Sequence, residues 1–135
     1  MTQVKEWTDN KLNRELTKLL GYKVIKVPNA DKYRMVNPHG KEFGMTWSTE
    51  GLVWNDYAFP FCTDHAASLE VQTAAIKADP RKYGINLAKL LKLEEDDLEY
   101  SENDVFSYTG VTIFLLASPR ERAEAAYQTL QEVRE

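Results

Sequence analysis

Two stretches of this chain decide how it folds: FPFCTDHAA at residues 59–67 and ASPRERAEAA at residues 117–126. Each starts a helix sharply, because a side chain that can cap the first turn is followed by small residues. In the second stretch Ser118 is the expected N-cap, Pro119 the first helical residue and Glu121 the partner in a capping box. The alanines that follow predict helices against which other elements pack closely.

The segment before the second stretch, residues 105–116, is the most apolar part of the chain. Side chains alternate between the two faces of a strand, and this segment would place apolar groups on both faces. A strand that is apolar on both faces is buried on both. The segment is therefore predicted to be a central strand, with the capped C-terminal helix covering one face of the sheet.

Further helices are predicted from spacing and end signals. Four leucines between residues 12 and 20 fall on one helix face, and Thr8 is the expected N-cap of that helix. Thr63 is expected to cap a second helix over residues 64–78. The Asp79-Pro80 pair is expected to end that helix and to begin another.

Between the first two helices the sequence predicts a β-meander. Residues 22–27 and 33–36 are rich in strand formers, and Asn37-Pro38-His39-Gly40 suits a type I turn. Phe43, Met45 and Trp47 are expected on one face of a returning strand. A second turn then leads into a further strand that begins at Leu52.

These elements predict an α+β fold in one domain over residues 1–135. The expected architecture is a mostly antiparallel sheet of four to five strands with helices packed on it, similar to an α-β-α sandwich. The chain has 135 residues, 43% hydrophobic and 28% charged, which is ordinary for a globular protein.

Composition also excludes some classes of protein. No apolar run is long enough to span a membrane, and residues 1–7 lack the apolar core of a signal peptide. The single cysteine, Cys62, suits a reducing cytosol, so a cytoplasmic location is expected. A net charge of −4 and a pI near 5.3 argue against nucleic acid as a partner.

Cys62-Thr63-Asp64-His65 is the one group that suggests a nucleophile. A helix N-terminus lowers a thiol pKa, and a histidine can act as base. A lone cysteine is more often a small buried hydrophobe, and nothing in the sequence places a base beside it. We therefore expect no catalytic residues and no enzyme activity, and keep a small-ligand binder or enzyme at this helix start as the alternative.

Metal and cofactor sites are not expected. His39 and His65 are far apart in sequence, and the acidic run at residues 94–97 lacks the ligand spacing of a calcium loop. No glycine-rich phosphate loop is present. Ser118 with Arg120 and Arg122 could bind an anion at a helix start, but capping alone explains the serine and would leave both arginines exposed.

An aromatic-rich zone is the best candidate for a binding surface. It contains Trp47, Trp54, Asp56 and Tyr57, and aromatic side chains dominate interface hot spots. The alternative is that the zone forms core and one sheet edge, because strands favour aromatic residues in any case.

The order of three blocks resembles the phage ABA-sandwich domain family, small proteins of phages and prophages. LTKLLGY at residues 16–22 is similar to its opening helix, FCTDHAA at residues 61–67 resembles its aromatic-Ser-Thr-Asp block, and ASPRERAEAA resembles its closing helix. The resemblance implies helices stacked on both sides of a sheet. It carries no reaction and no catalytic residues.

The expected function is that of a phage or prophage accessory protein that binds a host or phage protein. The acidic residues 94–104 are a hypothetical mimic of nucleic-acid charge. Edge strands in so small a sheet also favour a homodimer.

Overall fold

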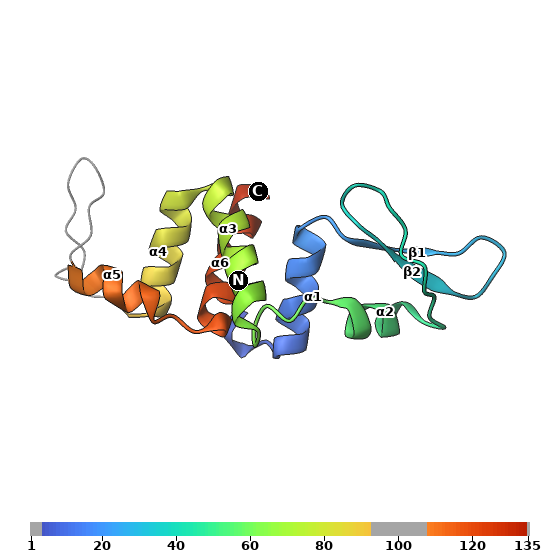
Figure 1. Ribbon diagram of the computed structural model, residues 1–135, viewed down its shortest axis with the longest axis horizontal. Helices are drawn as coiled ribbons and strands as arrows, with labels where there is room; N and C mark the ends of the chain where they lie inside the picture. Colours follow the sequence, from blue (N-terminus) through green and yellow to red (C-terminus); the bar gives the residue numbers. More distant parts are fainter. Residues whose placement is uncertain (1–3, 93–107, 135) are drawn as a thin grey trace. The chain divides into compact units, whose positions relative to one another are not determined.

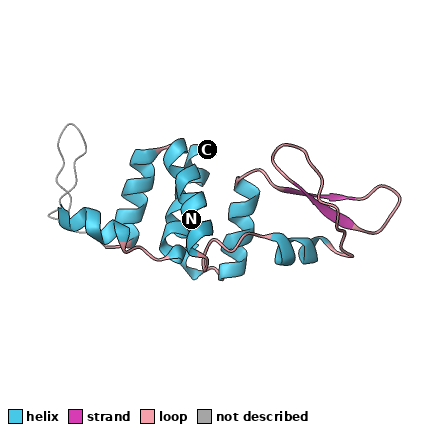
Figure 2. Ribbon diagram, in the orientation of Figure 1, coloured by secondary structure: helices cyan, strands magenta, loops and turns pink. Residues whose placement is uncertain are grey.

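The computed structural model describes residues 4–92 and 108–134, which are mostly helical (Figures 1 and 2). The chain divides into two compact units, Met1–Pro60 and Phe61–Glu135. We call them the hairpin unit and the helical unit and describe each by itself. The single domain predicted over residues 1–135 stays a prediction.

The hairpin unit begins with a 3₁₀ turn, η1 (Val4–Glu6), and helix α1 (Asp9–Leu19). Thr8 caps α1 as predicted, since its side chain accepts the Lys11 N–H at 3.2 Å. Leu12 and Leu16 are fully buried on the predicted face.

Strands β1 (Lys23–Lys26) and β2 (Tyr33–Val36) form an antiparallel hairpin. A third extended segment returns alongside β2, where Tyr33 and Trp47 exchange backbone hydrogen bonds of 2.8 and 2.9 Å. The predicted turn after β2 is confirmed, because the Gly40 N–H donates to the Asn37 carbonyl at 3.0 Å. Met45 differs from the prediction: it is 62% exposed and does not share a buried face with its neighbours.

The strand predicted to begin at Leu52 is wrong, because helix α2 (Glu50–Tyr57) occupies this stretch. The Thr49 hydroxyl accepts the Leu52 N–H at 3.3 Å, so the polar residues read as a turn are a helix cap. Val53 and Trp54 of α2 pack with Met35 of β2 to form the core of the hairpin unit.

The helical unit contains α3 (His65–Ala78), α4 (Pro80–Leu90), α5 (Tyr108–Leu115) and α6 (Pro119–Arg134). Helices α3, α4 and α6 contact one another pairwise (Figure 1). Asp79 alone connects α3 to α4. Its N–H donates to the Ala75 carbonyl at the end of α3, and its carboxylate accepts the Lys82 N–H at the start of α4.

The predicted capping box of α6 is confirmed. The Glu121 N–H donates to Ser118 Oγ at 3.1 Å, and the Ser118 N–H donates to Glu121 Oε1 at 2.9 Å. Helix α3 is capped one residue later than predicted, by Asp64 in place of Thr63. Fully buried small residues on α6 allow its neighbours to approach closely: Ala123, Ala125, Ala126 and Thr129.

The central strand predicted over residues 105–116 is wrong where the structure describes it. Residues 108–115 form α5, and residues 105–107 lie outside the described residues. Leu115 is 75% exposed and Leu116 83% exposed, so this apolar segment is not buried on both faces. The described part of the helical unit offers no strand for it to pair with, whereas a helix satisfies its own backbone groups.

The α+β fold with a four- to five-stranded sheet is therefore also wrong. The described residues contain one two-stranded sheet, β1 with β2, and otherwise helices and loops. The helix layers on both sides of a sheet, which the family resemblance implied, are not formed by these residues. Two stretches with strand-like composition, residues 52–54 and 108–115, became helices.

Candidate functional site

A cavity of about 450 Å³ lies in the helical unit among α3, α4, α5 and α6, and we call it the Arg122 cavity. Helix α3 lines it with four residues spaced i, i+4, i+7 and i+11, which share one helix face. These are His65, Leu69, Gln72 and Ile76. Helix α4 lines the opposite wall through Pro80, Tyr83, Gly84 and Leu87.

Arg122 of α6 is the charged group of this cavity and is only 3% exposed. Its Nε–H donates to Ser68 Oγ at 2.9 Å, and Nη1 donates to the Ala117 carbonyl. Nη2 lies 2.7 Å from His65 Nδ1. These three contacts hold the guanidinium between α3 and the residues that lead into α6.

All three partners of Arg122 are neutral. A guanidinium only donates hydrogen bonds, so His65 Nδ1 is the acceptor and the imidazole carries its proton on Nε2. The nearby acid on the same helix, Glu124, pairs instead with Arg120, whose Nε lies 3.2 Å from Glu124 Oε2. No carboxylate of the described residues forms an ion pair with Arg122.

Burial of this charge has a cost, which the three neutral contacts offset without neutralising the charge. Removing one ion from water costs several kcal/mol in a protein, and a hydrogen bond to a charged group recovers roughly 1.5–3 kcal/mol. An anion next to the guanidinium would add the opposite charge that these contacts do not supply. The cavity beside Arg122 is a place where such an anion can lie.

Tyr83 and Gln72 form a second polar pair on the cavity wall. Tyr83 is 4% exposed, and its hydroxyl donates to Gln72 Oε1 at 2.7 Å. Burial raises the pKa of Tyr83, and the positive charge of Arg122 acts in the opposite direction without cancelling the rise. The phenol is therefore neutral at physiological pH and remains the donor in this hydrogen bond.

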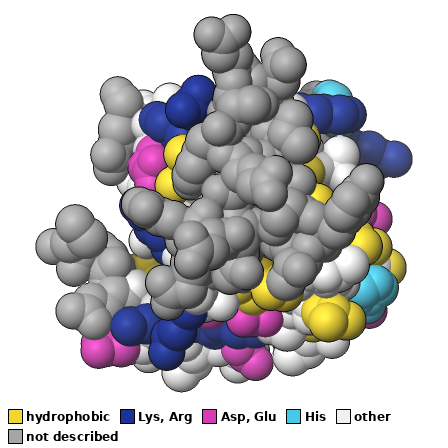
Figure 3. Space-filling view, turned by 90° about the vertical axis from the view of Figure 1, so that its left-hand side faces the viewer, with side chains coloured by type: hydrophobic (Ala, Val, Ile, Leu, Met, Phe, Trp, Pro, Cys, Tyr) yellow, Lys and Arg dark blue, Asp and Glu magenta, His cyan; other side chains and the backbone are white. Residues whose placement is uncertain are grey.

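The rest of the wall is apolar. It is formed by Leu69, Ile76, Leu87, Phe114 and Leu115. Leu69 and Ile76 are 38% and 40% exposed, so the apolar wall reaches the surface and the cavity is open. In the space-filling view of Figure 3, hydrophobic side chains are visible beside charged ones.

The residues predicted as a binding surface do lie together, in the hairpin unit. Trp47 Nε1–H donates to Asp56 Oδ2 at 2.6 Å, and the Trp47 ring meets Tyr57 edge to face at 4.5 Å between centroids. Trp54 is 5% exposed and belongs to the core. Much of the surface of these aromatic side chains is thus buried by packing within this unit.

Of the four residues at the α3 start, His65 is the one that reaches the cavity. Cys62 is 5% exposed, Asp64 caps α3, and the Thr63 side chain lies at the surface. In the other candidate group, Ser118 acts as the cap, as predicted. The expectation that Arg122 is exposed is wrong.

Sequence reasoning missed Gln72 and Tyr83 altogether and placed Arg122 on the wrong side of its helix. A signal for Arg122 was present, because it precedes Ala126 by four residues and therefore shares a face with it. Gln72 and Tyr83 carry no such signal, since their meeting depends on how α3 packs against α4.

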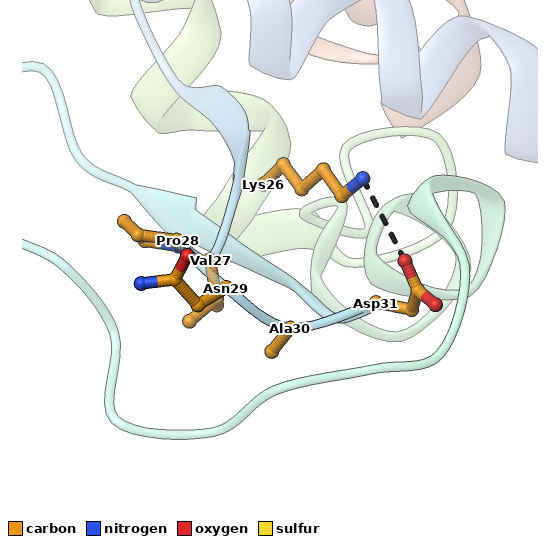
Figure 4. A pocket seen from close by; sticks show the side chains of 6 residues that line it. All are labelled: Lys26, Val27, Pro28, Asn29, Ala30 and Asp31. Carbon is orange, nitrogen blue, oxygen red and sulfur yellow. Dashed lines mark ion pairs between the residues drawn. The ribbon is translucent and has the colours of Figure 1, made fainter.

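A second depression lies at the hairpin turn and is lined by residues 26–31 (Figure 4). Lys26 Nζ lies 3.6 Å from Asp31 Oδ1, but both side chains are largely exposed, at 60% and 103%. An exposed pair of this kind is worth little, and all lining residues come from one loop. We do not treat it as a site.

Two kinds of feature are absent from residues 4–92 and 108–134. No helix there is both long and apolar enough to cross a membrane. No three His, Cys, Asp or Glu side chains in those ranges gather as metal ligands would.

No protein-family model, curated protein or solved structure matches this chain. The resemblance to the phage ABA-sandwich domain family stays a prediction.

Proposed function

We propose that the protein acts by binding, and that the Arg122 cavity takes a small organic anion. The observation that carries this proposal is the guanidinium of Arg122, 3% exposed, on the cavity wall, with neutral partners at all three of its contacts. An anionic ligand supplies the negative charge that these contacts lack.

The donors left on Arg122 suit a carboxylate. The guanidinium has five N–H groups, and its three contacts leave one on each terminal nitrogen. A carboxylate has two oxygens and pairs well with two such donors. The volume of about 450 Å³ holds on the order of fifteen groups of the size of water, at roughly 30 Å³ each.

The apolar wall sets the rest of the ligand. Leu69, Ile76 and Leu115 are exposed where the cavity opens, and an apolar body would cover them. Simple inorganic anions would leave this area in water, so we expect them to bind weakly.

Calorimetric titration of the full chain tests the proposal. Octanoate is the main probe, benzoate tests a shorter apolar body, and inorganic phosphate tests charge alone. Arg122→Gln removes the charge and is expected to weaken octanoate binding about tenfold to a hundredfold, as loss of a charged hydrogen bond of roughly 1.5–3 kcal/mol implies.

Arg134→Gln is the matched control, because it makes the same charge change on the exposed last turn of α6. It should leave octanoate affinity unchanged. Arg122→Lys keeps the charge without the two-pronged geometry and serves if Arg122→Gln does not fold. Equal octanoate affinity in the wild type, a folded Arg122 variant and Arg134→Gln would reject the proposal.

Binding without catalysis is part of the same proposal. The proton-exchanging groups at the cavity are His65, whose Nδ1 is occupied by Arg122, and Tyr83, whose pKa burial raises. The hydroxyl beside Arg122, on Ser68, is fully buried and both accepts from Arg122 and donates to the His65 carbonyl. Because these groups are occupied or buried, we expect the protein to bind its ligand without changing it chemically.

A protein partner is the second candidate function. It is favoured by exposed apolar side chains on and after α5: Val111 at 42%, Leu115 at 75% and Leu116 at 83%. The prediction of a host or phage protein as partner applies here. If a protein binds this surface, Leu116→Asp should abolish capture of that protein from bacterial lysate, while Thr112→Asp on the neighbouring helix α5 should not.

The other functional expectations remain proposals. They are the phage or prophage origin, the cytoplasmic location and the homodimer. The acidic segment proposed to mimic nucleic acid, residues 94–104, lies outside the described residues.

A further inference from the structure

The Arg122 cavity presents polar and apolar groups in alternation along α3. His65 with Arg122 forms one polar position, Leu69 follows, Gln72 forms a second polar position, and Ile76 follows it. A helix rises 1.5 Å per residue, so Gln72 lies about 10 Å along the axis from His65. A ligand along this wall meets a polar group twice.

The second polar position has a fixed orientation. Tyr83 donates its hydroxyl hydrogen to Gln72 Oε1 at 2.7 Å, which assigns the amide oxygen to the Tyr83 side. Because burial keeps Tyr83 neutral, this hydrogen bond persists across physiological pH. The Gln72 amide nitrogen, with two N–H donors, is left on the other side.

Those two donors have no acceptor among the residues that the structure describes. The Gln72 amide is half-buried, and its donors need an acceptor when a ligand covers them, because they then lose their hydrogen bonds to water. A purely hydrocarbon chain would cover the Gln72 amide and offer its N–H groups no hydrogen-bond acceptor. A carbonyl oxygen in the ligand would satisfy it.

We infer that the ligand is an amphipathic carboxylate with a hydrogen-bond acceptor part-way along its chain, as in an N-acyl amino acid. Its carboxylate binds Arg122, its amide carbonyl accepts from Gln72, and its acyl tail covers Ile76 and Leu115. This inference rests on the proposed function and adds the ligand class to it.

The test compares two probes of equal chain length, N-octanoylglycine and undecanoate. They share the carboxylate and the length, and differ in the amide. Each is titrated against the wild-type chain and against Gln72→Leu. The measured quantity is the ratio of the two affinities, so a general change in the cavity cancels.

We expect Gln72→Leu to lower the preference for N-octanoylglycine about threefold to tenfold, the usual worth of one neutral hydrogen bond. Gln128→Leu, on a half-buried position of α6 that does not line the cavity, is the matched control and should keep the wild-type ratio. Tyr83→Phe, which frees the amide to turn, should also lower the ratio and serves if Gln72→Leu does not fold.

The two proposals fail in different ways. If both probes bind and both need Arg122, but the ratio is the same in wild type and Gln72→Leu, the ligand class is wrong and the anion site stands. If neither probe binds the wild type, or if Arg122→Gln binds both as well as the wild type does, the anion site and the inference both fail.

Discussion

Arg122 shows how far a single side chain can depart from what its neighbours in sequence suggest. It lies between Glu121, a capping-box residue, and Ala123, and the first turn of α6 also contains Arg120. Such a run usually marks an exposed helix start. Its spacing from Ala126 and Thr129 instead places it on the buried face, where Ser68 and His65 meet it.

Tyr83 leads to a prediction about pH. Burial raises its pKa above the ordinary value of about 10, so above that pH the unfolded chain releases the phenol proton and the folded chain keeps it. This stabilisation is present in full below about pH 10 and is lost as the pH rises further. Wild-type stability should therefore fall between about pH 9 and about pH 11 more steeply than that of Tyr83→Phe.

Urea unfolding at those two pH values measures the difference. One fully shifted group changes the slope by at most about 1.4 kcal/mol per pH unit. Tyr33→Phe, outside the cavity, is the control and should behave as the wild type. Parallel losses in the wild type and Tyr83→Phe would show that the folded state does not hold back this proton.

The elements that sequence predicts well are those whose ends carry their own signals. The caps at Thr8, Asp79 and Ser118 act within three residues, so the chain alone shows where these helices start. The elements that sequence misread, α2 and α5, contain β-branched and aromatic residues that strands also use. Whether such a stretch becomes a strand depends on a partner strand elsewhere in the fold.

The cap of α6 makes this point measurable. Ser118→Ala removes the oxygen that accepts the Glu121 N–H and should lower the free energy of unfolding by about 1 kcal/mol. Ser118→Asp keeps an acceptor there and should lie within a few tenths of a kcal/mol of the wild type. Thermal or urea unfolding gives both values, and equal stability of Ser118→Ala and the wild type would contradict the role of this cap.

At the scale of the whole molecule, each of the two units has its own set of buried residues. Leu12, Leu16 and Met35 are fully buried in the hairpin unit, and Val71, Ala75 and Ala126 in the helical unit. Composition predicted the wrong sheet. It placed a central strand in the helical unit, whose described residues contain no strand. The site could not be predicted because its walls come from four helices.

Because the buried residues of the hairpin unit and the residues that line the Arg122 cavity belong to different units, a substitution can be expected to change stability without changing binding. Leu12→Ala should lower the free energy of unfolding by about 2–5 kcal/mol, because Leu12 is fully buried and the smaller side chain leaves a space. Octanoate affinity of the folded variant should stay within about twofold of the wild type, since every residue that lines the Arg122 cavity lies beyond residue 60. Calorimetry below the unfolding transition measures this affinity. A tenfold loss of octanoate affinity in Leu12→Ala would contradict the prediction.

The Asp79 connection has a consequence for how a molecule enters the cavity. With one residue between α3 and α4, hydrogen-bonded to both, the two walls are held together at the end where these helices join. The two helices then lose little conformational freedom when a ligand binds between them, which favours high affinity for narrow ligands. The same connection limits how wide the cavity can become. Branching of a ligand near its carboxylate should therefore lower its affinity more than lengthening its acyl chain does.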